Sequence, residues 1–252
     1  IWTAGVYSTN LRVNLDATNR NSLASDTSTV WSSIAPGVAV SSIGKTATSA
    51  ATSTPGAMVF ANTYVNFGHI TSAEIPGDIT VEAWIKLASS YTTSTANQVI
   101  ASHYYDATTD SKTNDSQDWY FRINGGKLQL FTSNGSGVES SVITGTVLTN
   151  NFADKWIQVG FTQKADGRVQ FYLNGSPVET LKAGNARRGS TTAKLLISTG
   201  LSGLYGSISR FRMYAAELTA DQIKTNFDLE YETFGQQKVT FNSNVGAGST
   251  TS

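Results

Sequence analysis

The sequence predicts an all-β fold: a two-layer antiparallel β-sandwich of the jelly-roll type, with one short helix near its C-terminal end. Many short segments alternate apolar and polar residues, as half-buried strands do. Gly and Asn turns join these segments at even spacing, which favours antiparallel hairpins. The strands outnumber those of an immunoglobulin module of ~100 residues. A larger jelly-roll sandwich therefore fits the pattern better.

The composition of the chain restricts the kinds of molecule that the protein is expected to bind. The chain has 252 residues, is 39% hydrophobic and 14% charged, and carries a formal net charge of +0. We therefore expect no nucleic-acid partner. No apolar run approaches the ~18 residues of a membrane span, so no membrane insertion is expected. With 0 Cys, disulfides and thiolate metal sites are excluded. Low charge with abundant Ser and Thr is typical of an extracellular or virion surface, where we expect this protein.

The first third of the chain is its least regular part. Residues 11–15 alternate with three apolar side chains on one face, and a polar loop follows at 16–26. A Thr-, Ser- and Ala-rich run at 45–56 predicts an exposed loop. Further short strands are expected at 38–43, 58–60 and 64–67, the last two about a turn at Asn62.

The middle of the chain is far more regular. Residues 79–87 form a long strand with one strongly apolar face. Asp166-Gly167 and Asn174-Gly175 are hairpin signals, because both central positions of a type I′ turn need positive φ. Further strands are predicted at 98–105, 119–123, 127–132, 157–161, 169–173, 177–181 and 194–199.

The stretch 203–228 predicts a long strand that leads into a capped helix. The strand's apolar phase slips near Arg210, which fits a β-bulge. Arg210 and Arg212 are expected to point outward, paired within the sheet. Thr219 with Gln222 forms a capping box at the helix start. One amphipathic helix in a strand-rich chain needs a sheet to pack on.

Three segments carry a family resemblance. ITVEAWIKL (79–87), KWIQVGFTQKADGRVQFYLNGSPV (155–178) and GSISRFRMYAAELTADQIKTNF (206–227) occur in this order. Together they resemble the laminin-G-like, concanavalin-A-like lectin-glucanase jelly-roll family. The opening LRVNLDATNRNS (11–22) is similar to that of phage and bacterial surface members. The resemblance implies the sandwich fold, while the fold itself hosts lectins, glycosidases, adhesion modules and spacers.

We expect one domain with two tails. The jelly-roll domain spans 11–232, preceded by an apolar N-terminal arm at 1–10 and followed by a C-terminal tail at 233–252. The tail is either a frayed end or a strand added to a neighbouring subunit. The apolar residues of both ends are the assembly candidates: Ile1, Trp2, Val6, Tyr7, Val239 and Phe241. The chain starts without Met, so we expect a processed product or part of a longer chain.

An enzymatic function is not expected. Glycosidases need two carboxylates across the scissile bond, and the resemblance implies a spacing such as E-x-D-x-E on one strand. Glu82 stands alone on its strand, and no such cluster occurs. It is better explained as a strand residue bonded to a neighbouring backbone group or Arg. The two His, His69 and His103, belong to no identifiable motif.

The polar loop at 106–118 is the main candidate for a binding site. Its carboxylates are hard oxygen donors that suit Ca²⁺: Asp106, Asp110, Asp115 and Asp118. A solvated acidic loop without a metal ion explains the same residues. Exposed aromatic residues and an amide near this loop suit sugar faces and hydroxyls: Tyr104, Tyr105, Trp119 and Asn114. Tyr104 and Trp119 are equally compatible with strand positions that cover the core. Apart from Ca²⁺, no cofactor is expected.

Two functions remain in view. The first is a non-catalytic structural or decorating module of an assembled virion or extracellular surface, such as a capsid, tail or filament, with self-association or other subunits as partners. The second is a Ca²⁺-dependent carbohydrate-binding adhesin or lectin with surface glycans as partners. The two are compatible, and a glycosidase is the least favoured.

Overall fold

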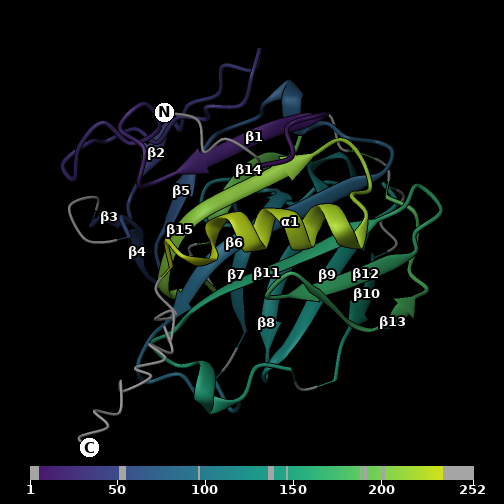
Figure 1. Cartoon of the computed structure of the whole chain (residues 1–252). Coiled ribbons are helices and arrows are strands. Elements are labelled where there is room, and N and C mark those ends of the chain that lie inside the picture. The colour runs from purple at the N-terminus through teal and green to yellow at the C-terminus, as the bar shows by residue number, and fades with distance from the viewer. Residues whose placement is uncertain are drawn as a thin grey trace, which may run out of the picture.

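The computed structural model describes residues 6–50, 55–95, 97–135, 139–145, 147–187, 189, 192–199 and 202–234. Two antiparallel sheets face each other and one helix, α1 (Ala220–Tyr231), lies across the outside of the first sheet (Figure 1). The predicted all-β sandwich with a C-terminal helix is confirmed. Within the described residues, no helix is both long and apolar enough to cross a membrane.

The first sheet has eight strands. Seven follow the order β13 (Ser176–Lys182), β12 (Val169–Leu173), β11 (Trp156–Gln163), β6 (Ile79–Leu87), β15 (Tyr205–Tyr214), β4 (Met58–Ala61) and β3 (Thr48–Ser49). The eighth, β1 (Leu11–Asp16), pairs with the second half of β15. The strand predicted at 79–87 is thus β6, near the centre of this sheet.

The second sheet has seven strands. Their order is β10 (Glu139–Ile143), β9 (Lys127–Ser133), β8 (Gln117–Asn124), β7 (Gln98–Tyr104), β14 (Lys194–Ser198), β5 (Tyr64–Asn66) and β2 (Gly44–Lys45). Three short 3₁₀ helices lie in connections: η1 (Thr71–Ala73), η2 (Asn114–Ser116) and η3 (Asn150–Phe152). The sheet's outer face carries no helix among the described residues.

The core lies between the sheets and follows the alternation of the strands. Val81 and Ile85 of β6 point into it, and Phe161 of β11 packs there against Trp119 and Phe121 of β8. All five side chains are buried. Each large apolar side chain buried in this way stabilises the fold by about 1.5–3 kcal/mol.

The strand β15 contains the predicted bulge. Its register against β6 shifts between Ile208 and Arg210. Before the bulge β15 pairs with β4, and after it with β1. The irregularity therefore marks the point where β15 changes its outer neighbour.

Helix α1 begins as its sequence predicts. Thr219 is the N-cap, and its capping box with Gln222 is formed in both directions. Leu218 and Ile223, on either side of the cap, are buried in one small apolar cluster. Phe227 stacks on Trp84 of β6, with ring centroids 5.4 Å apart. The helix thus seals the outer face of the first sheet.

Beneath α1 the sheet presents charged side chains. Arg210 and Arg212 are 3% exposed and both pair with Glu230 of the helix. Trp84 Nε1 also donates to Glu230 Oε2 at 2.7 Å. Burial alone would raise the pKa of Glu230, but the two guanidinium groups outweigh it and hold the pKa below its ordinary value. Both Arg therefore pair with the helix, which was not predicted, while Arg210 also pairs with Asp16 of β1, within the sheet as predicted.

Local details differ from the sequence predictions in a few places. Residues 38–43 form no strand and make only an isolated bridge from Ser41 to Ser32. The predicted loop at 45–56 includes the two-residue strand β3, and β10 was not anticipated. Asn174 and Gly175 both have positive φ, as the type I′ turn requires. At the other hairpin only Gly167 does, because that loop is longer.

Candidate functional site

A shallow pocket lies on the open outer face of the second sheet, where β7, β8 and β14 run side by side. Its volume is ≈ 170 Å³. We call it the tyrosine pocket and define it by Ser102, Tyr104, Tyr105, Tyr120, Arg122 and Leu196, which all line it. Two of these, Tyr104 and Tyr105, are glycan-binding candidates from the sequence.

Strand alternation places these side chains. On β8, Trp119, Phe121 and Ile123 point into the core, so Tyr120 and Arg122 point outward. In the ladders, Ser102 of β7 is opposite Tyr120 of β8 on one side and Leu196 of β14 on the other. Three adjacent strands therefore supply the floor and walls.

Half-buried aromatic rings form a continuous row across the pocket. Tyr104 meets Tyr105 at 5.1 Å between ring centroids and Tyr120 edge-on at 5.4 Å. Tyr120 in turn stacks on Phe131 of β9, at 4.6 Å with the ring planes 11° apart. Rings held in place by their neighbours lose little conformational entropy when a ligand packs on them.

The phenol groups of Tyr104 and Tyr120 stay protonated at neutral pH. Burial and the neighbouring Glu139 raise the pKa of Tyr104 above its ordinary value, and its hydroxyl donates to Glu139 Oε1 at 2.6 Å. Burial raises the pKa of Tyr120 to about 12. Both rings therefore present neutral hydroxyls beside apolar faces.

Two polar groups in the pocket remain without a usual partner. The guanidinium of Arg122 lies over the rings of Tyr120 and Phe131, at 5.4 and 5.0 Å, and forms no ion pair with a described residue. Ser102 is 1% exposed, and its hydroxyl has no hydrogen-bond partner among the described residues. Buried polar groups in native structures usually have partners. The Nη groups of Arg122 are thus free to bind a ligand, whereas the Ser102 hydroxyl is buried beneath the surface of the pocket.

Trp119 and Asp118 lie elsewhere. Trp119 is fully buried between the sheets, so it cannot meet a glycan at the surface. Asp118 is also fully buried and binds Arg187 through both carboxylate oxygens at 3.0 Å. His103 Nδ1 is 2.9 Å from the same carboxylate. Burial would raise the pKa of Asp118, but Arg187 and His103 outweigh it and lower the pKa. Its role is to hold the 183–187 segment to β8.

Among the remaining residues of the acidic loop, Asp106 and Asp110 lie together, since the backbone N–H of Asp106 donates to Asp110 Oδ2 at 3.0 Å. Asp106 is buried and its carboxylate accepts from Thr108 and Asn66, while Asp110 pairs with Lys194 at 2.7 Å. Asp115 and Asn114 lie in η2 with exposed side chains. No three His, Asp or Glu residues in the described ranges come close enough to hold a metal ion. Ca²⁺ binding stays a prediction.

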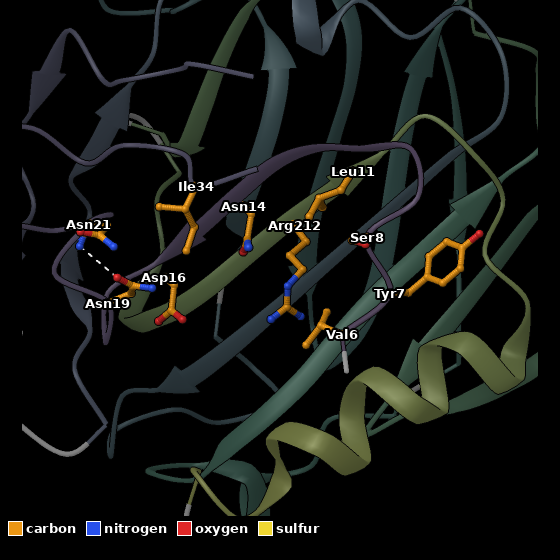
Figure 2. Close-up of a pocket in the computed structure, with 10 residues that line it drawn as sticks. All are labelled: Val6, Tyr7, Ser8, Leu11, Asn14, Asp16, Asn19, Asn21, Ile34 and Arg212. Carbon is orange, nitrogen blue, oxygen red and sulfur yellow. Dashed lines mark hydrogen bonds between the residues drawn. The ribbon is translucent and has the colours of Figure 1, made fainter. Parts of the chain in front are cut away.

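A second, smaller pocket adjoins the N-terminal segment (Figure 2). Arg212 and Asn14 point into it and Val6 lies across it. Its volume of ≈ 60 Å³ holds a few water molecules. Tyr7 beside it donates its backbone N–H to Asn226 of α1 at 2.9 Å. This part of the arm therefore packs on its own domain.

A third hollow, the helix groove, lies where α1 ends. Trp156, Phe227 and Tyr231 line it, with a volume of ≈ 350 Å³. Phe234, the last described residue, stacks on Trp84 and meets Trp156 edge-on at 5.3 Å. The other assembly candidates lie outside the described residues: Ile1, Trp2, Val239 and Phe241.

Comparisons with solved structures show the same fold in larger proteins. The binding domain of botulinum neurotoxin serotype D/C matches with a TM-score of 0.65 and 14% identity, over 88% of this chain and 53% of that one. The binding domain of Paraclostridial Mosquitocidal Protein 1 matches at 0.63 and 13%, over 86% and 52%. A botulinum neurotoxin DC binding domain in complex with SialylT matches at 0.62 and 15%, over 88% and 52%. The chain thus spans about half the length of these structures.

The sequence itself identifies the family. No curated protein matches the chain in sequence. A family model described as the concanavalin A-like lectin/glucanases superfamily, of the laminin G type, matches residues 60–224, which is more than half of the chain. The predicted resemblance is confirmed, and the protein belongs to the concanavalin A-like lectin/glucanase superfamily.

Proposed function

We propose that this protein is a non-catalytic carbohydrate-binding module and that its glycan site is the tyrosine pocket. The observation that carries the proposal is the row of half-buried rings beside the Arg122 guanidinium, which lines the same pocket. Aromatic faces pack against the C–H faces of sugars, while fixed polar groups select hydroxyls. The pocket is open and shallow, which suits a sugar unit within a chain.

Two further points support a binding role over catalysis. The structural neighbours are described as binding domains, and at 13–14% sequence identity they share the fold with this chain. In this chain Glu82 is the sole carboxylate on β6, and it lies beneath α1 on the opposite side of the molecule from the tyrosine pocket. Glu230 lies nearby, but Glu82 is 2% exposed and Glu230 is fully buried, so the two cannot flank a glycosidic bond.

The test compares two tyrosines on a glycan array. Tyr120→Ala removes the central ring of the row, and Tyr231→Ala removes an aromatic ring from the helix groove. We expect glycan binding by the wild type and by Tyr231→Ala, and a loss of up to about tenfold for Tyr120→Ala, since stacking on a ring contributes about 0.5–1.5 kcal/mol beyond its area. Loss through Tyr231→Ala alone would move the site to the helix groove. EDTA in a parallel run tests the Ca²⁺-dependent alternative.

A structural or decorating role on an assembled virion or extracellular surface is the second proposal. Its support is the helix groove, where exposed aromatic surface adjoins the point at which the chain continues past Phe234. Deleting residues 235–252 and measuring the native mass tests it. An oligomer that keeps its mass after the deletion would remove this support.

A further inference from the structure

The charge of the tyrosine pocket deepens the proposed function, on which this inference rests. We infer that the pocket selects acidic saccharides, with the carboxylate of the sugar bound by Arg122. The argument starts from what already holds this guanidinium. Arg122 Nε donates to Gln129 Oε1 at 2.7 Å, and Asn124 donates to the same oxygen at 3.1 Å. Gln129 itself is held by Ser141. One edge of the guanidinium is therefore fixed.

The other edge is free. A guanidinium has five N–H donors, and only the Nε one has an acceptor among the described residues. The plane is supported by Tyr120 and Phe131, whose rings lie within 5.4 Å of its central carbon. A supported, partly desolvated guanidinium with free Nη donors matches the two oxygens of a carboxylate.

The acidic side chains around the pocket do not compete for this charge. Glu139 pairs with Lys112 at 2.6 Å, and Asp110 pairs with Lys194 at 2.7 Å. Asp106 lines the pocket but is 1% exposed. Its oxygens already accept hydrogen bonds from Thr108 and Asn66. Arg122 is thus the charged group of the pocket that retains free donors for a ligand.

The alternation of β8 places Arg122 beside the pocket's aromatic rings. Tyr120 and Arg122 are two residues apart on this strand, so both point to its outer face, and both line the tyrosine pocket. A sugar that contacts the rings of the pocket therefore has the free Nη donors of Arg122 close by.

The experiment uses an array of carboxylated glycans, each paired with its neutral carboxyl-reduced counterpart. The proteins are the wild type, Arg122→Gln, Arg122→Lys and the control Arg168→Gln. Arg168 is exposed and pairs with Asp166 beside the first sheet, so the control removes one positive charge far from the pocket. Thermal melting checks that each variant is folded.

We expect the wild type and Arg168→Gln to prefer the carboxylated member of a pair by about tenfold or more, the size of one charge-assisted hydrogen bond. Arg122→Gln should abolish this preference, and Arg122→Lys should restore it only in part. Equal binding of both members by the wild type would overturn the acidic selectivity and leave the glycan site intact. Binding to neither member would overturn the proposed function itself.

Discussion

Glu82 offers the sharpest test of how the sheet and the helix are joined. Its carboxylate is 2% exposed and lies between β6, β11 and α1. Gln158 Nε2 donates to it at 3.1 Å, and Asn226 Nδ2 donates at 2.8 Å. Burial raises its pKa from 4.5 to about 7, against the opposing effects of Arg212 and the hydrogen bonds. The prediction concerns stability against pH for Glu82→Gln.

The sign follows from which state binds the proton more tightly. The folded pKa is the higher one, so the folded protein holds this proton more strongly than the unfolded chain does. Stability from this group is fully present below pH 4.5 and falls as the pH rises toward about 7. An increase in the pKa of Glu82 from 4.5 to about 7 corresponds to a decrease of about 3 kcal/mol in the free energy of unfolding. Above pH 7 the loss is complete.

The assay is urea unfolding of wild type and Glu82→Gln at a series of pH values from 4.5 to 8. We expect the difference between their unfolding free energies to change by about 3 kcal/mol across this range. A constant offset between the two proteins is also expected. The amide oxygens of Asn226 and Gln158 already accept hydrogen bonds, from Tyr7 N–H and Gly175 N–H, so both side chains present their NH₂ groups to residue 82. The NH₂ group of the introduced amide would therefore meet a donor where the carboxylate offered an acceptor. The exposed Glu232→Gln is the matched control. Parallel curves for the wild type and Glu82→Gln would refute the reasoning.

Three further substitutions test the fold. Arg187→Ala should destabilise the protein by about 3–5 kcal/mol in urea unfolding, because it leaves a buried carboxylate unpaired; adding Asp118→Asn should recover part of the loss, and no recovery would contradict this. Thr219→Ala should cost about 1 kcal/mol through the lost N-cap, whereas Thr219→Ser should be nearly neutral. Gly175→Ala should lower the melting temperature, because φ is +73° and the added Cβ would lie 2.8 Å from Phe227 Cβ; an unchanged melt would rule out that contact.

Much of the fold could be predicted because apolar and polar side chains alternate along its strands, and this pattern is visible in short stretches of sequence. Residues 79–87 became β6 since every second side chain is apolar and faces the core. The strand β10, by contrast, lies at a sheet edge and its first residues are polar, with Val142 as its buried apolar residue. Alternation gives little signal where only one side of a strand pairs and little of it is buried.

The site could be predicted in part. Tyr104 and Tyr105, chosen because they flank a polar loop, line the tyrosine pocket, whereas Trp119 is buried, one residue out of phase with the outward-facing Tyr120. The signal for the right choice was present: Trp119, Phe121 and Ile123 share one apolar face, which assigns Tyr120 and Arg122 to the other. No such signal existed for the pairing of Arg212 with Glu230, since it depends on how α1 lies over the sheet.

The two outer faces of the sandwich differ in what covers them. On the first sheet α1 covers Glu82 and two buried Arg. Its Asn226 donates to Glu82, and its Glu230 pairs with Arg210 and Arg212. On the second sheet the row of rings and Arg122 remain open. If binding belongs to the open face, Glu82→Gln should alter the pH dependence of unfolding without changing glycan affinity. A parallel fall in affinity would mean that the face beneath α1 takes part in binding.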